Sequence, residues 1–116
     1  MAITRHEPKG LLSKVVEANG FVFTAGITAD DSKADAQGQA EQILREIDRL
    51  LKLCSTDKSK IISATIWVSD IRHLEKMNVA WNAWTGGQNL PGRACVEAKL
   101  ADPNLLVEIA VVAAKG

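Results

Sequence analysis

Two segments of this chain are β-prone and carry apolar side chains on both faces of the strand that each would form. Side chains along a strand point alternately to opposite sides, and in Ile61 to Val68 both sides include apolar groups. The segment Leu105 to Ala114 is apolar at every position except Glu108. Strands of this composition are typical of a sheet that is covered on both faces. The fold must therefore bury both faces of these two strands.

The sequence around these strands predicts a hairpin and two helices. Asn19-Gly20 separates two short β-prone runs and favours the tight turn of a β-hairpin. Two other segments repeat apolar residues at the spacing of an amphipathic helix. The predicted elements are strands at 13–18 and 21–25, a loop at 26–33, a helix at 34–54, a strand at 61–68, a helix at 71–84 capped by Asp70, and strands at 94–100 and 105–114.

This order, β-β-α-β-α-β-β, predicts one α+β domain over residues 1–116, with a mixed sheet and two helices on one face. The two helices cover one face of the apolar strands. The other face must be covered from outside the chain, and a second copy of the same chain is the simplest cover. The sequence thus predicts a homo-oligomer.

Composition and charge narrow the classes of partner. The formal net charge is zero, whereas nucleic-acid binders need basic surface to neutralise phosphates. No apolar run approaches the ~20 residues of a membrane-spanning helix. Residues 1–9 are polar and lack the apolar region of a signal peptide. We therefore expect a cytoplasmic protein that binds neither nucleic acid nor membranes.

The sequence contains no recognisable metal or nucleotide motif. Its two cysteines, Cys54 and Cys95, and its two histidines, His6 and His73, show no metal-ligand spacing. Two free thiols in a reducing compartment are the simpler interpretation. Glycine-rich phosphate loops and the common hydrolase motifs are absent. We therefore expect neither a metal nor a cofactor.

Glu108 and Arg93 are the charged residues best placed for chemistry. Because Glu108 lies in an apolar run, it needs a cationic or donor partner, or its pKa rises and it serves as an acid or base. Arg93 follows Pro91-Gly92 at the start of a strand, where its planar fork suits a carboxylate. The alternatives are a structural ion pair or a carboxylate at the edge of the sheet for Glu108, and a plain surface position for Arg93.

Cys95 and Asn78 are weaker candidates. Cys95 shares a strand face with Arg93, and it is either a nucleophile with a lowered pKa or a small packed thiol. Asn78 lies beside the apolar stripe of the second helix, where its amide either orients a ligand or caps a neighbouring loop.

Several segments resemble the RidA/YjgF family. The family has a Pro-x-Arg-x-Cys-Val-Glu strand, which the segment Pro91 to Glu97 resembles. The family's next strand reads Ile/Val-Glu-Ile, which Val107-Glu108-Ile109 resembles. The spacing from the arginine to the glutamate also agrees. Further similar segments are Phe23 to Gly26, Ser63 to Asp70, and Met77-Asn78 with Trp81. The likeness extends from about Gly10 onward.

The resemblance implies a chorismate-mutase-like fold of the bacillus type and a homotrimer with clefts between subunits. It also implies hydrolytic deamination of 2-imino or 2-enamino acids, such as 2-iminobutanoate and 2-iminopropanoate, to 2-keto acids and ammonia without a cofactor. Arg93 would bind the substrate carboxylate, backbone groups near Cys95 would hold the imine nitrogen, and Glu108 would activate water. The remaining cleft residues implied are Asn78, Ala25, Gly26 and Leu12.

Three positions depart from the family pattern. Leu12, Ala25 and Ile27 stand where the family has Tyr, Ser and Gln. We expect a more apolar cleft that favours bulkier imines.

Two other functions stay open. The first is a regulatory trimer that binds small carboxylates without turnover. The second is an endoribonuclease or translation inhibitor, which the zero net charge and the lack of a basic, aromatic-rich face disfavour.

Overall fold

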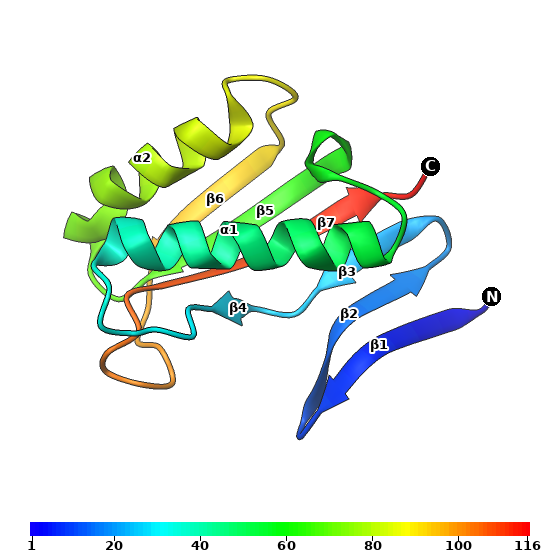
Figure 1. The fold of residues 1–116 in the computed structure, drawn as a ribbon, viewed down its shortest axis with the longest axis horizontal. Helices are drawn as coiled ribbons and strands as arrows, with labels where there is room; N and C mark the ends of the chain where they lie inside the picture. The colour runs from blue at the N-terminus through cyan, green and yellow to red at the C-terminus, as the bar shows by residue number, and fades with distance from the viewer.

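One mixed sheet of seven strands forms the centre of the computed structural model, which describes residues 1–116 (Figure 1). The strands are β1 (Ile3–Lys9), β2 (Leu12–Ala18), β3 (Phe21–Thr24), β4 (Ile27–Thr28), β5 (Ile61–Val68), β6 (Gly92–Glu97) and β7 (Val107–Ala114). The helices are α1 (Ala36–Leu53) and α2 (Leu74–Thr85), with short 3₁₀ turns η1 (Lys58–Lys60) and η2 (Ile71–His73). Both helices lie in front of the sheet in Figure 1, so the predicted α+β class is confirmed.

The strand order across the sheet is β1-β2-β3-β7-β5-β6, and β4 pairs with the start of β7. Neighbouring strands are antiparallel except β5 and β6, which run parallel and are joined through the crossover helix α2. The predicted Asn19-Gly20 turn joins β2 to β3, and both of its residues have positive φ. The two doubly apolar strands, β5 and β7, lie side by side inside the sheet.

The core lies between the sheet and the helices. Asp35 caps α1, because its carboxylate accepts a hydrogen bond from the Gly38 N–H at 2.9 Å. The predicted apolar stripe of α1 is buried, namely Ala40, Ile43, Leu44, Ile47, Leu50 and Leu51. Alternate residues of β7 meet this core, namely Val107, Ile109, Val111 and Ala113. The burial of these two stripes fixes which face of the sheet the helices cover.

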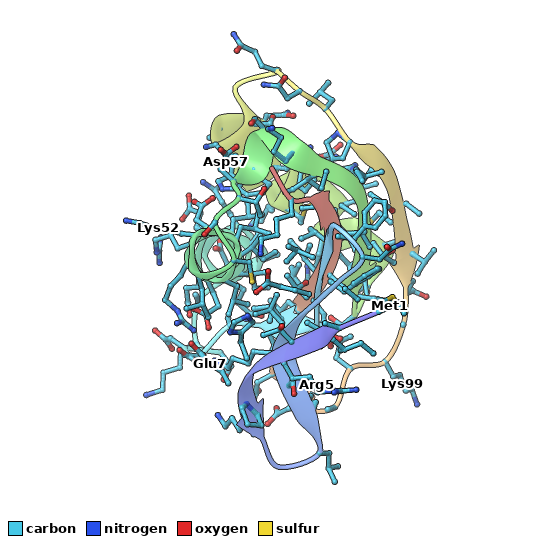
Figure 2. All side chains as sticks on the ribbon, turned by 90° about the vertical axis from the view of Figure 1, so that its right-hand side faces the viewer. Met1, Arg5, Glu7, Lys52, Asp57 and Lys99 are labelled. Atoms are coloured by element: carbon cyan, nitrogen blue, oxygen red, sulfur yellow. The ribbon has the colours of Figure 1, made fainter.

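No helix covers the other face of the sheet. Figure 2 shows the molecule from the side, with Lys52 of α1 and Lys99 beyond β6 on opposite sides. Three large apolar side chains on the uncovered face, Phe21, Phe23 and Val96, are each 38% to 47% exposed. The sequence predicted a homo-oligomer from the uncovered face of β5 and β7; these three side chains lie on the same face of neighbouring strands, and the oligomer stays a prediction.

Two strands of the structure were not predicted. Strand β1 pairs with β2 at the edge of the sheet, and its sequence ITRHEPK has too few apolar residues to indicate a strand. Strand β4, with only two residues, interrupts the predicted loop at 26–33. The predicted order therefore lacked one edge strand and one short strand, although the strands and helices that it did contain are present.

A β-bulge in β5 also changed one face assignment. Strict alternation along 61–68 predicts that Ile62 shares a face with Ala64, Ile66 and Val68, but the register shifts between Ile61 and Ser63. As a result Ile61 is 6% exposed and joins the core, whereas Ile62 is 48% exposed. The second helix differs at its start: Asp70 caps η2, and α2 itself begins three residues later than η2 does.

Candidate active site

Arg93 lies on the helix side of the edge strand β6, next to α2. Its register partner on β5 is the buried Ala64, so both side chains point towards the helices. The Nη1 group of Arg93 donates a hydrogen bond to Oδ1 of Asn78 at 2.8 Å. The central guanidinium carbon lies 5.2 Å from the centre of the Trp81 ring. The hydrogen bond and the cation–π contact hold the guanidinium in place and leave further N–H donors for a ligand.

Cys95 shares the helix-side face of β6 with Arg93. Its thiol packs against the core, and burial raises its pKa while the charge of Arg93 offsets this in part. Cys95 is therefore a packed thiol rather than an activated nucleophile. Along β6, the backbone N–H and C=O groups of successive residues face alternately towards β5 and away from it. The Ala98 N–H faces β5, because it donates to the Val68 carbonyl, and Cys95 lies three residues before Ala98. The N–H and C=O of Cys95 consequently face the free edge of β6, where they can bind a ligand.

Glu108 lies on the uncovered face of the sheet. Its register partners are Trp67 of β5 and Thr28 of β4. Burial raises the pKa of the Glu108 carboxyl, and no charge or hydrogen bond opposes that shift. Glu108 therefore forms no structural ion pair within the chain. The environment is that of a carboxyl suited to proton transfer.

Gly26 provides the space for the Glu108 carboxylate. A Cβ atom on Gly26 would lie 2.0 Å from Oε2 and 2.9 Å from the carboxyl carbon of Glu108. The φ angle of Gly26 is not positive, so the backbone conformation alone would accept another residue. The glycine is required here because the carboxylate lies against its Cα atom.

Leu12, Ala25 and Gly26 line one pocket of about 150 Å³. Ile27 also borders the pocket, but its side chain is only 6% exposed and packs into the core. Polar residues that the sequence did not single out complete the lining, namely Lys9, Lys14, Thr28, Asp30, Gln42 and Glu46. Within one chain this pocket is mainly polar, and the apolar character expected from the sequence rests on Leu12 and Ala25.

The predicted residues thus form two separate groups. The β6 group contains Arg93, Cys95 and Asn78. The Glu108 group contains Glu108 and Gly26, and Gly26 also borders the pocket lined by Ala25 and Leu12, which Glu108 itself does not line. Glu108 and Arg93 are separated by two strand spacings (~10 Å) and by three residues along the strands (~10 Å), and they point to opposite faces of the sheet. One chain alone does not bring both to the same small ligand.

The fold and these two groups define a class: an α+β protein with a one-sided mixed sheet that carries an arginine and a desolvated glutamate on opposite faces. A model of the family described as Endoribonuclease L-PSP matches residues 3–115. The chain belongs to this family, as its resemblance to the RidA/YjgF proteins predicted.

Relatives and solved structures agree with this assignment. A RutC family protein of Haemophilus ducreyi is 41% identical over 112 residues, covering 97% of this chain and 96% of the relative. The RutC family protein YoaB of Escherichia coli is 36% identical over 114 residues, covering 98% and 99%. The crystal structure of NMB1025, a YjgF family member from Neisseria meningitidis, matches with a TM-score of 0.96 and 36% identity, covering 100% of this chain and 97% of that one.

Neither α1 nor α2 combines the length and the hydrophobicity that a transmembrane span needs.

Proposed function

We propose that this protein hydrolyses reactive 2-imino and 2-enamino acids to 2-keto acids and ammonia, in clefts between the subunits of a homotrimer. The observation that carries the proposal is the state of Glu108, a half-buried carboxyl with a raised pKa and no partner. A raised pKa makes a carboxyl a better proton acceptor and lets it return the proton during turnover. The same activity is what the resemblance to the RidA/YjgF family implies.

In the proposed reaction, the Arg93 guanidinium binds the substrate carboxylate through charge-assisted hydrogen bonds. Glu108 accepts a proton from a water molecule while the water oxygen attacks C2 of the imine. The same carboxyl returns this proton to the nitrogen, which gives a carbinolamine. Glu108 then passes the hydroxyl proton to the amino nitrogen as the C=O bond forms and the C–N bond breaks, so that ammonia and the 2-keto acid leave. An enamine first gains a proton at C3 and loses one from its nitrogen, which gives the imine. The reaction needs no redox partner.

The proposal requires two copies of the chain. Arg93 and Glu108 lie on opposite faces of one sheet, so a shared ligand must sit between Arg93 of one protomer and Glu108 of its partner. Packing the uncovered face against another copy would also remove the exposed side chains of Phe21, Phe23 and Val96 from water. Burial of this apolar surface therefore favours an assembly in which the Glu108 side of the sheet faces a partner chain.

The direct test is an imine-trapping assay. An amino-acid oxidase generates imino acids with several side chains, and semicarbazide traps whatever imine remains. We expect the protein to reduce the trapped adduct, and Arg93→Ala and Glu108→Ala to abolish this effect. Arg72→Ala is the matched control, because Arg72 is an exposed arginine paired with Asp70. Unchanged trapping with every imine, from folded protein, would contradict the proposal.

A non-catalytic carboxylate binder is the second candidate, because Asn78 and Trp81 hold the Arg93 guanidinium in place. This candidate predicts Arg93-dependent binding of a 2-keto acid, measured by calorimetry, together with no effect in the trapping assay. The deaminase predicts both binding and turnover.

A further inference from the structure

A second cluster of reactive side chains lies away from both site groups. His6 of β1, Glu17 of β2 and Cys54 at the end of α1 each present one possible metal-ligating atom, and the three atoms lie within 4.8 Å of one another. The Nε2 atom of His6 lies 2.5 Å from Oε2 of Glu17. Lys115 forms an ion pair with Oε1, the other oxygen of the Glu17 carboxylate.

The residue types and their spacing suit a zinc ion. Zinc prefers imidazole nitrogen, thiolate sulfur and carboxylate oxygen in a tetrahedral arrangement. With bonds of ~2.0–2.3 Å, neighbouring ligand atoms of such a site lie ~3.4–3.7 Å apart. His6 and Glu17 must separate by about 1 Å, and Cys54 must approach by no more than about 1.4 Å. Side-chain rotations of this size leave the three backbone segments in place.

The surroundings of the cluster also suit a divalent cation. Glu17 and Cys54 are shielded from water, with exposed fractions of 14% for the Glu17 side chain and 1% for Cys54. A carboxylate that ligates a metal is usually oriented by a hydrogen bond to its other oxygen, and Lys115 provides that contact. One thiolate and one carboxylate supply two negative charges, which the ion shares with the Lys115 ammonium.

We propose that His6, Glu17 and Cys54 bind one Zn²⁺ ion per chain, with a water molecule as the fourth ligand. Cysteine is ordinarily a thiol near pH 7, and Cys54 is buried beside the Glu17 carboxylate. Zinc binding forms the Zn–S bond and releases the thiol proton to the solvent. The bound ion would link the edge strand β1, strand β2 and the end of α1. It would thereby stabilise an edge of the sheet that few buried side chains hold.

The experiment uses the full-length protein, reduced and stripped of metal with a chelator. Titration with Co²⁺ reports thiolate ligation through the sulfur-to-cobalt charge-transfer absorption, and Zn²⁺ is then added to displace it. We expect one Co²⁺ per chain, displacement by one Zn²⁺, and a rise in the melting temperature with Zn²⁺. Cys54→Ser and His6→Gln should each weaken binding by roughly 100-fold or more.

The chain supplies matched controls, because it has one other cysteine and one other histidine. Cys95→Ser and His73→Gln should bind cobalt as the unmodified protein does. His6 is partly exposed, so His6→Gln tests the site even if Cys54→Ser fails to fold. The proposal is overturned by the absence of the thiolate absorption at one equivalent of Co²⁺, or by an absorption that persists in His6→Gln. In that case the cluster is an ion-pair network only. Neither result depends on imine hydrolysis.

Discussion

The close approach of the Glu108 carboxylate to Gly26 predicts that Gly26→Ala greatly lowers activity. The new methyl group would lie 2.0 Å from Oε2 of Glu108, so the carboxylate must move by at least about 1.4 Å to reach an ordinary contact of ~3.4 Å. The displaced atoms are the far end of a side chain, so the backbone need not shift. If Glu108 is the general base, a misplacement of this size should lower kcat/KM about 100-fold.

The same substitution should hardly affect stability. Because φ of Gly26 is not positive, alanine fits the backbone. Alanine also reduces the conformational freedom of the unfolded chain, which stabilises the folded state and offsets the cost of displacing the carboxylate. The free energy of unfolding should therefore change by less than about 1 kcal/mol. The assay is imine trapping with semicarbazide, run beside denaturant unfolding. Gly92→Ala is the control, because its Cβ would meet nothing closer than the Ile62 carbonyl at 3.7 Å. Activity of Gly26→Ala within about threefold of wild type would refute the assigned role of Glu108.

Four further predictions concern stability, pH dependence and substrate. Because the pKa of Glu108 is raised in the folded state, its ionised form destabilises the protein at neutral pH. Glu108→Gln should therefore raise the free energy of unfolding at pH 7, measured with urea. The same substitution should abolish turnover. In the wild type, kcat/KM should fall with decreasing pH around a midpoint above 4.5, where Glu108 becomes protonated. Hydrogen bonds from Arg49 and Lys14 lower the pKa of Glu46 to about 2. The ionised carboxylate should therefore add roughly 1–3 kcal/mol to the free energy of unfolding above pH 4.5, and this stability should be lost as the pH falls towards 2. Urea unfolding of Glu46→Gln at several pH values should lack this acid-sensitive part. The wild type should prefer branched and aromatic imines, and Leu12→Tyr should shift that preference towards short chains in competition assays.

Much of the fold could be predicted because its signals are local. Asn19-Gly20 marks a turn by its own conformational preference, and the α1 stripe shows a helical period in its sequence. Strand β1 gives no such signal, since an exposed edge strand has little need for apolar residues. The bulge at Ile62 depends on the register against β7, which alternation along one strand does not reveal.

The candidate site was predictable only in part for the same reason. The sequence indicated that Arg93 and Cys95 share a face and that Glu108 is desolvated, and these follow from alternation and apolar context. It did not indicate that Arg93 and Glu108 lie on opposite faces, because this depends on which side of the sheet the helices cover. Nor did it indicate the polar pocket lining or the cluster around Glu17, whose members come from distant segments.

The most direct test of the central claim is complementation between two inactive variants. We expect Arg93→Ala and Glu108→Ala each to be inactive alone. The two variants carry different tags and are mixed in equal amounts under conditions that allow subunit exchange. Mass spectrometry of the tagged chains verifies that exchange has occurred. In a trimer with sites between subunits, random mixing restores both residues in about a quarter of the clefts. The account predicts about a quarter of wild-type imine hydrolysis. A mixture that exchanges subunits and stays inactive would contradict a site shared between chains.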